Sequence, residues 1–434
     1  MKKRAFLKLS STILSTAAIA SCVQKPSPRK NWAGNIEYSS DSSYEPATVD
    51  ELRSIIQSHD HIKGQGTCHS FNTIADSNYG FVRTTKLNQV VSLDETNMTV
   101  TVQAGIRYGE LCKYLEAKGY SLHNLASLPH ISVGGSVATA THGSGVKNRN
   151  LSSAVLGMKI MNASGEEIEA GGDLSVHLGA LGIVTEVTLA IQPTYQVRQY
   201  VYQHLLMSNL KDHFTEIMSA GYSVSLFSDW SKDINQVWVK KKADDGNAPS
   251  ELFGATAAAK DLHPIESISA VNCTPQMGMP GPWHERLPHF KLDFIPSAGE
   301  ELQAEYFVPL SNGYEAIEAV YGLREKVTPL LQISEVRTIA SDDLLMSPMH
   351  GRDTLAIHFT WKKDWEGVRG VLPLIEDALT PLDVRPHWGK LFTLDPKVLQ
   401  SRYKDDLPKF LEQATRFDPN GKFINEFLQK YLLS

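Results

Sequence analysis

The sequence is poor in cysteine and has no large excess of charge of either sign. Its 434 residues include 4 cysteines, and 42 lysines and arginines stand against 48 aspartates and glutamates, for a formal net charge of −6. Three well-separated cysteines beyond the N-terminus do not make a disulfide framework, and no basic block follows the N-terminus to neutralise a nucleic-acid backbone. We therefore expect no structural disulfide and no nucleic-acid partner.

Two common nucleotide-binding motifs are also missing. The chain has neither the G-x-G-x-x-G of nicotinamide-binding Rossmann folds nor the G-x-x-x-x-G-K-[ST] of P-loop proteins, and it has no internal repeat. His123, His130 and His142 have no compact ligand spacing, and neither a carboxylate nor a cysteine lies between them. The sequence thus disfavours these two nucleotide-binding classes, and we predict no metal site.

The N-terminus has the order of an export signal. Lys2-Lys3-Arg4 precedes a short apolar run, 13–19, that is too short to span a bilayer. The string from Lys3 to Lys8 resembles a twin-arginine signal, and the residues up to Cys22 resemble a bacterial lipoprotein cleavage site. The alternative is a plain cleaved signal with a coincidental cysteine. We expect residues 1–30 to be signal and tether of an exported protein, either periplasmic or membrane-anchored through lipidated Cys22.

Hydrophobic periodicity predicts an α+β chain. Helices are expected from Val49 and over 107–118, and strands over 61–63, 90–93, 99–104, 155–161, 167–170 and within 179–190. After Pro193 the pattern changes to aromatic and β-branched strands, including 197–205 and 223–227, which places a domain boundary near residue 195. Residues 246–260 and 275–288 have the composition of loops.

A short glycine-bearing loop follows the first helix and strand, with the sequence Gly64-Gln65-Gly66-Thr67-Cys68-His69-Ser70-Phe71-Asn72. Glycines let consecutive backbone N–H groups converge on an anion such as a pyrophosphate. Taken alone, the loop is better explained as a surface turn that carries an ordinary histidine than as a phosphate cradle. A second segment, 124–145, is rich in small residues and hydroxyls. It has no stretch apolar enough for a core helix, so it can lie flat against a large ligand.

Together the two segments resemble the vanillyl-alcohol-oxidase type of flavoprotein, and within it the bacterial alditol (xylitol) oxidases and their sugar-1,4-lactone oxidase relatives. The resemblance runs from Asn31 to Phe427. It implies a two-domain fold of the PCMH type with a separate, sheet-based substrate domain. The implied divisions are an FAD-binding domain over 31–194, a substrate-binding domain over 195–385 and a C-terminal return to the FAD domain over 386–434.

The resemblance also implies FAD, bonded covalently through its 8α-methyl group to His69. Relatives usually have glycine where this chain has Cys68, so a positive φ there would strain the loop. The backbone near Val184 would contact the adenine half of the flavin. The implied cofactor-binding positions are Gly64, Gln65, Gly66, Thr67, Cys68, His69, Ser70, Ser127, Ser132, Gly135, Ser136, Val137, Ala138, Thr139, His142, Val184 and His387.

Three short strings in the second half carry the candidate chemistry, namely 334–338, 358–361 and 385–390. Residues two apart share one face of a strand, so Glu335 and Arg337 would face one cavity, as would His358 and Thr360. The alternative is a surface ion pair and a packed histidine. By resemblance, the residues that contact the hydroxyls of a polyol are Ser127, Glu335, Arg337, Thr360 and Lys390.

Our mechanistic hypothesis gives Arg337 the task of stabilising negative charge on the reduced flavin. Lys390, with its pKa lowered by that neighbouring cation, would assist removal of the hydroxyl proton, and either His358 or His387 could do so instead. The implied reaction oxidises the C1 alcohol of an alditol such as xylitol or sorbitol to the aldose and reduces O2 to H2O2.

Other functions remain open at this stage. The substrate could be a sugar-1,4-lactone, the electron acceptor a quinone or a cytochrome, or the protein a non-catalytic exported sugar-binding protein. The small-molecule polyol and O2 are the expected partners, and the chain is expected to be a monomer.

Overall fold

The computed structural model describes residues 29–293 and 300–434 of the chain. The expected export signal and Cys22 lie outside these residues. Arg29 already belongs to the fold, because its guanidinium lies over the rings of Tyr38 and Phe81 and donates to Gln65 Oε1 at 3.0 Å. Within the described residues, no helix is both long and apolar enough to cross a membrane.

The first half of the chain is built on an antiparallel five-stranded sheet. Its order is β4 (Val90–Asp94), β5 (Thr99–Gln103), β9 (Ile183–Ala190), β7 (Val155–Met161) and β8 (Glu167–Gly171). Beside it lies a small parallel sheet of β1 (Ser43–Tyr44), β3 (Phe81–Arg83) and β2 (Lys63–Gln65). The strand predicted over 61–63 therefore begins two residues later and carries the first residues of the glycine loop.

Helix α1 (Val49–Gln57) begins where its sequence predicts. The Thr48 hydroxyl accepts a hydrogen bond from the Glu51 N–H at 3.1 Å, and Leu52 and Ile56, one turn apart, are fully buried. Helix α2 (Tyr108–Ala117) also matches its predicted position. A five-residue helix, α3 (Val133–Val137), lies in the segment for which no helix was predicted. It is too short to show periodicity, but Val133 and Val137 are both in the hydrophobic core.

The second half forms one large antiparallel sheet. The chain leaves the first half after β10 (Gln192–Pro193), which pairs with β6 (Tyr120–Ser121). The large sheet has the order β14 (Glu251–Leu252), β15 (Ala255–Ala257), β11 (Gln196–Leu205), β13 (Ile234–Lys242), β12 (Ser223–Ser228), β18 (Leu331–Ile339), β19 (Thr354–Lys362), β17 (Glu301–Pro309) and β20 (Arg385–Pro386), with β16 (Gly281–Pro282) paired to β11.

The prediction of a loop over 246–260 was wrong in part, because β14 and β15 form a hairpin within this range. Its own residues have no strand periodicity. Ala257 pairs with Tyr202 of β11, so an existing sheet edge creates this hairpin.

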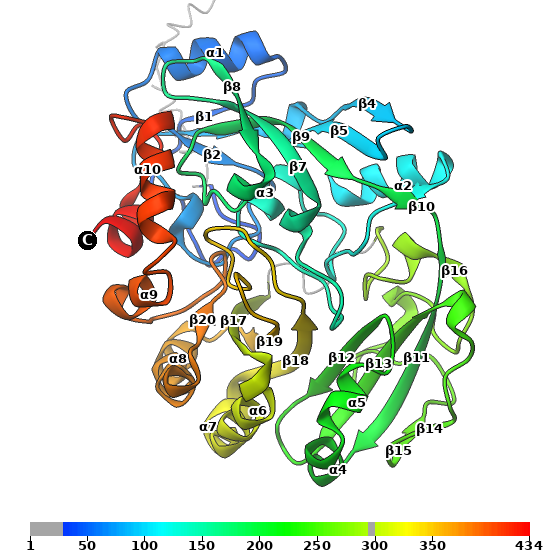
Figure 1. Ribbon diagram of the computed structural model, residues 1–434. Helices are drawn as coiled ribbons and strands as arrows, with labels where there is room; N and C mark the ends of the chain where they lie inside the picture. The colour runs from blue at the N-terminus through cyan, green and yellow to red at the C-terminus, as the bar shows by residue number, and fades with distance from the viewer. Residues whose placement is uncertain (1–28, 294–299) are drawn as a thin grey trace, which may run out of the picture.

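One face of the large sheet is covered by helices and the other faces the first half of the molecule (Figure 1). The covering helices are α4 (Met207–Asp212), α5 (Phe214–Met218), α6 (Gly313–Gly322), α7 (Arg324–Val327) and α8 (Trp365–Leu379). Their apolar side chains form one core with those of the strands, including Val336, Ile357 and Phe359. Because side chains alternate along a strand, the residues next to these three in the sequence must point to the opposite face of the sheet.

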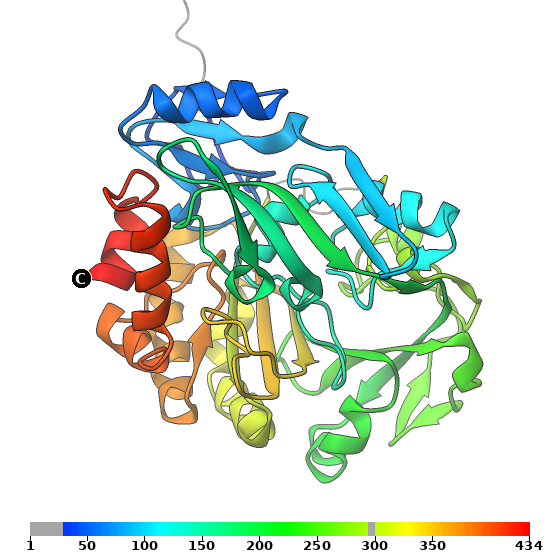
Figure 2. The same ribbon diagram turned by 45° about the horizontal axis from the view of Figure 1, so that its top comes forward.

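The C-terminal segment returns to the first half. Figure 2, like Figure 1, shows α10 (Leu407–Phe417) beside the part of the molecule that holds α1, and α9 (Pro396–Arg402) lies below it, toward α8. Ala163 N–H donates to the Phe417 carbonyl at 3.2 Å and Ile62 N–H to the Lys422 carbonyl at 3.0 Å. After α10, near the short helix α11 (Glu426–Leu428), Asn425 donates to the backbone carbonyl of Ile74, just beyond the glycine loop.

Candidate active site

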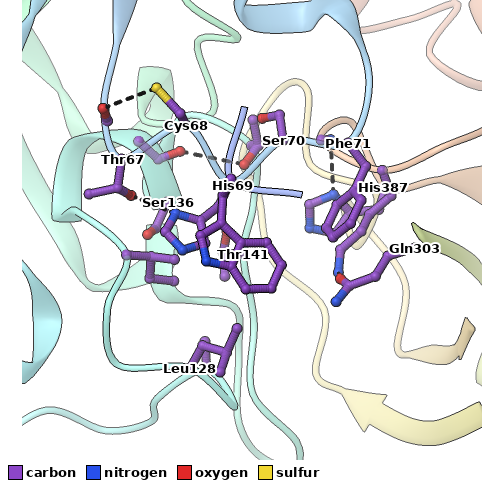
Figure 3. Close-up of a pocket in the computed structure, with 18 of the residues that line it drawn as sticks. Thr67, Cys68, His69, Ser70, Phe71, Leu128, Ser136, Thr141, Gln303 and His387 are labelled. Carbon is purple, nitrogen blue, oxygen red and sulfur yellow. Dashed lines mark hydrogen bonds between the residues drawn. The ribbon is translucent and has the colours of Figure 1, made fainter. Parts of the chain in front are cut away.

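A cavity of about 460 Å³ lies between the two halves. Its walls combine the glycine loop, the small-residue segment and the uncovered face of the large sheet. In Figure 3, His69 lies with Thr67 and Ser136 to one side and with Phe71, His387 and Gln303 to the other. Nearly all the site residues predicted from the sequence line this cavity: Gly64, Gln65, Gly66, Thr67, Cys68, His69, Ser70, Ser127, Gly135, Ser136, Ala138, Thr139, His142, Val184, Glu335, Arg337, His358, Thr360, His387 and Lys390.

Two predicted cofactor contacts, Ser132 and Val137, are not part of the cavity lining. The Val137 side chain packs in the hydrophobic core, because it shares a face of α3 with Val133, and it is not part of the cavity wall. Ser132 lies behind the glycine loop and is almost fully buried, and its Oγ has no hydrogen-bond partner among the described residues. A buried hydroxyl without a partner is costly, so Ser132 is poised to bond a group that enters the cradle.

The two cradle segments approach each other so closely that little room is left for a side chain at Gly66. A Cβ on Gly66 would overlap Ser132 Oγ and would lie 3.5 Å from Gly135 Cα. Cys68 stands where relatives usually have glycine, and it does adopt a positive φ, of 60°. A non-glycine residue there stores backbone strain, and the Cys68 thiol contacts the Gln65 side-chain oxygen at 3.8 Å. Cys68, Cys112 and Cys273 are free thiols.

The His69 ring is held at the cavity surface by two contacts. Its Nδ1 lies 3.0 Å from the Thr67 hydroxyl, and its ring stacks on Trp32 with the centroids 5.2 Å apart. Burial lowers the pKa of His69 to about 4. The imidazole is therefore neutral at neutral pH and keeps a free electron pair on one nitrogen.

The opposite wall consists of polar side chains in register on three strands. Glu305 of β17 pairs with His358 of β19, which in turn pairs with Glu335 of β18. In the next row, Gln303 pairs with Thr360. The prediction that Glu335 and Arg337 share a face, and that His358 and Thr360 do, is confirmed by the position of all four on the cavity wall.

Glu305 is the central residue of this wall, and sequence reasoning missed it. Its Oε1 lies 2.6 Å from Arg337 Nη2 and 3.2 Å from His142 Nε2, and its Oε2 lies 3.4 Å from His358 Nδ1. Burial opposes ionisation, but the charge of Arg337, followed by the two histidines, outweighs it and lowers the pKa of Glu305 well below its ordinary value. The alternation of Glu301, Gln303 and Glu305 within an apolar strand was the signal available in the sequence.

Lys390 projects from the loop after β20 into the cavity and donates to the side-chain oxygen of Gln303, whose amide donates in turn to Glu301. Its pKa is lowered to about 8, with burial as the largest cause, and Arg337 lowers it further while Glu305 opposes the shift. The hypothesis from the sequence attributed the lowered pKa of Lys390 to Arg337 alone, whereas burial is the larger cause. Asn72 joins this loop to the glycine loop by donating to the carbonyls of Trp388 and Lys390 at 2.8 and 2.7 Å.

The two alternative bases are less suited to proton removal. Burial lowers the pKa of His358 to about 4 and that of His387 well below its ordinary value. His387 Nδ1 also accepts a hydrogen bond from Gly389 N–H at 3.0 Å. A base works best when its pKa lies near the working pH, which favours Lys390.

The cradle fits a large planar cofactor with a phosphate-bearing tail. It offers a glycine loop without room for side chains, an unpaired buried hydroxyl at Ser132 and a cavity of the size that ligand sites have. These features fit FAD, and the comparisons with known proteins identify the chain as an FAD-binding oxidoreductase of the PCMH or vanillyl-alcohol-oxidase fold. Residues 42–171 match the FAD binding domain family, and residues 300–431 match the D-arabinono-1,4-lactone oxidase family.

The chain belongs to the alditol oxidase family of FAD-dependent oxidoreductases. It is 44% identical over 416 residues to the alditol oxidase of Streptomyces sp. (strain IKD472 / FERM P-14339), which covers 93% of this chain and 98% of that one. The L-gulono-1,4-lactone dehydrogenase of Mycobacterium tuberculosis (strain ATCC 25618 / H37Rv) is 25% identical, with coverage of 93% and 98%.

Solved structures of cholesterol oxidases share the fold. A solvent-stable cholesterol oxidase has a TM-score of 0.74 at 17% identity, with 94% of this chain and 97% of that one covered. The cholesterol oxidase from B. sterolicum has a TM-score of 0.76 at 15% identity, with 93% and 96% covered.

Gly66→Ala tests the fit of the cradle to FAD. We expect the added methyl group to push the two cradle segments apart and to lower the retained flavin by about ten-fold or more, since close approach of the backbone is lost. The measurement is flavin absorbance per polypeptide in the purified protein. Gly370→Ala, whose Cβ would meet nothing within 4 Å, is the control and should keep a full complement of flavin. Equal flavin content in the two variants would contradict this account of the cradle.

Proposed function

We propose that the protein oxidises the C1 alcohol of an alditol such as xylitol or sorbitol to the aldose, with O2 reduced to H2O2. The observation that carries the proposal is the pair of groups on the cavity wall. Glu335 Oε2 lies 3.7 Å from Arg337 Nε, and that nitrogen has no hydrogen-bond partner among the described residues. This separation is too long for a mutual hydrogen bond but lets a carboxylate and a cation bind adjacent hydroxyls of one polyol. The 44% identity to an alditol oxidase supports it.

The remaining wall residues have distinct tasks in this proposal. Ser127, 3.4 Å from Arg337 Nη1, and Thr360, 3.2 Å from His358 Nε2, bind further hydroxyls. Lys390 accepts the proton of the C1 hydroxyl as the hydride leaves the same carbon. FAD held by the cradle would supply the hydride acceptor and the two-electron chemistry with oxygen. Arg337 would offer its positive charge to the cofactor ring, and Glu305 holds the guanidinium in place at 2.6 Å.

The test is anaerobic bleaching of the flavin absorbance by a panel of substrates. Xylitol and sorbitol should bleach the purified protein within seconds, and on admission of air the colour should return with one H2O2 formed per substrate oxidised. L-gulono-1,4-lactone runs in parallel. Faster bleaching by the lactone would indicate that the protein is a lactone oxidase. Colour that returns only with a quinone or a cytochrome would indicate that this compound, and not oxygen, is the electron acceptor. A protein that none of these compounds bleaches would overturn the oxidation proposal and would favour the non-catalytic binding protein.

We also propose that His69 forms the covalent bond to the flavin. The neutral imidazole has a nitrogen electron pair available at the cavity surface, and its ring is held between Thr67 and Trp32. The C–N bond would replace one hydrogen of the flavin 8α-methyl group and the imidazole hydrogen, and two electrons and two protons would pass to oxygen. Attachment of the ring withdraws electron density from the flavin, which favours hydride transfer, and keeps the cofactor on an exported protein.

His69→Ala should leave a fold that binds FAD without a covalent bond. After acid precipitation we expect yellow colour in the pellet of the unaltered protein and in the supernatant of the variant. His61→Ala, whose ring stacks on Tyr79 and is not part of the cavity, should behave like the unaltered protein. Colour in the supernatant of the unaltered protein would overturn covalent attachment while leaving the oxidation proposal intact.

Lys390→Met tests the assignment of the base. With a pKa of about 8, lysine is the free base only above that pH, so the rate of flavin reduction should rise with pH and level off above about 8. The variant should retain its flavin, lose about 10²–10⁴-fold in reduction rate and show no such rise. Exposed Lys397→Met is the control. A variant that keeps the ionisation near pH 8 would remove Lys390 from proton transfer.

Export, and anchoring through Cys22, remain part of the proposal. They are supported by the order of basic residues, apolar run and cysteine in the N-terminal sequence. The same proposal takes the protein to be a monomer that acts on a small polyol.

A further inference from the structure

A further buried histidine, His289, lines the same cavity and contacts Glu335. His289 Nε2 lies 2.7 Å from Glu335 Oε1, and both side chains are almost fully buried. His289 follows a stretch of loop composition, and no pattern in the sequence marks it. Glu335 Oε1 is thus bonded to protein, whereas Oε2 is the oxygen that faces Arg337 at 3.7 Å.

Lys240 of β13 lies on the far side of the same imidazole. Its Nζ is 3.2 Å from His289 Nδ1 and also donates to the Leu287 carbonyl. Lys240 is itself fully buried and is not part of the cavity lining. A lysine enclosed in this way has to direct its hydrogens at acceptors, and His289 Nδ1 is one of them.

These contacts determine which nitrogen of His289 carries the hydrogen. Glu335 is a carboxylate, because burial, which opposes ionisation, is outweighed by Arg337 and then by His289, and its pKa falls well below its ordinary value. Burial lowers the pKa of His289 to about 4, so its ring is neutral. A carboxylate only accepts, so Nε2 carries the hydrogen and donates to Glu335, while Nδ1 accepts from Lys240.

The ring is also fixed in orientation. It meets Phe227 and Trp238 edge to face, with centroids 5.4 and 5.3 Å away. Its backbone carbonyl accepts from Thr274 N–H at 2.9 Å. Since Phe227 pairs with Glu335 across β12 and β18, the histidine and the carboxylate share one rigid support.

We propose that His289 is a positioning residue for substrate binding: it fixes Glu335 through Oε1, with its own tautomer set by Lys240, so that Oε2 is presented to a substrate hydroxyl. The inference rests on the proposed binding of a polyol by Glu335. Without His289, the carboxylate can turn toward Arg337 and form a closed ion pair, which removes both groups from the substrate.

The experiment compares His289→Met with His289→Gln. Methionine fills the space but cannot donate, whereas the glutamine amide nitrogen can take the place of Nε2–H. We expect methionine to raise the Kd for xylitol by about 5- to 100-fold, which corresponds to the loss of one hydrogen bond to a charged group, with kcat and flavin content nearly unchanged. Glutamine should restore the Kd to within about three-fold of the unaltered protein.

Binding is measured without turnover, by calorimetric titration of xylitol into the dithionite-reduced holoenzyme under anaerobic conditions, alongside KM and kcat in air. Lys240→Met/His289→Met removes the buried lysine together with its acceptor, and it replaces His289→Met if the single variant does not fold. Cys273→Ala is the control, because Cys273 packs in the same cluster as Phe227 and Trp238 but has no polar contact with Glu335. It should leave the Kd unchanged.

The outcomes separate the two proposals. If neither xylitol nor sorbitol bleaches the unaltered protein, the proposed function falls. If the unaltered protein reacts but methionine and glutamine give the same Kd, or Cys273→Ala raises it as much as His289→Met does, only the positioning role is overturned. A loss in kcat with an unchanged Kd would also overturn it.

Discussion

The ion pair between Glu305 and Arg337 holds the site together. A carboxylate buried to this degree is stable only when cations and hydrogen-bond donors surround it. Arg337 lies 2.6 Å away on β18, His358 faces the carboxylate from β19, and His142 reaches it from the cradle segment of the first half. Because the partners come from both halves of the chain, this one carboxylate sets the cradle against the substrate wall.

Two ionisable groups near that centre are each held by a neutral side chain. The same neutral side chain also contacts a second ionisable group, of the opposite type. Glu335 is followed by His289 and then by Lys240, and Lys390 is followed by Gln303 and then by Glu301. A neutral bridge fixes the orientation of the group that it contacts and keeps the two charges of each chain apart. Binding groups held in this way lose little freedom when substrate arrives, which is how an enzyme keeps a productive geometry.

Much of the fold was predictable because its signals are local. The Thr48 cap, the strands 155–161 and 197–205 and the helix over 107–118 each depend on neighbouring residues alone. The hairpin of β14 and β15 was missed because it exists only by pairing with β11, and α3 because five residues show no period. In the site, Glu335 and Arg337 were found from their spacing, whereas Glu305 and His289 were not. Glu305 is marked only by its alternation with Glu301 and Gln303, and no pattern in the sequence marks His289.

By itself the sequence determined the family, the cofactor class and the residues of the loop and strings that serve it, because short-range order in the chain carries these features. It could not decide which oxygen of Glu335 is free, why the pKa of Lys390 falls, or what holds Arg337 in place. Those properties depend on burial and on contacts between residues such as His142 and Glu305, more than 150 positions apart. Only the packed chain brings such groups within hydrogen-bond distance and removes the water that would otherwise screen their charges.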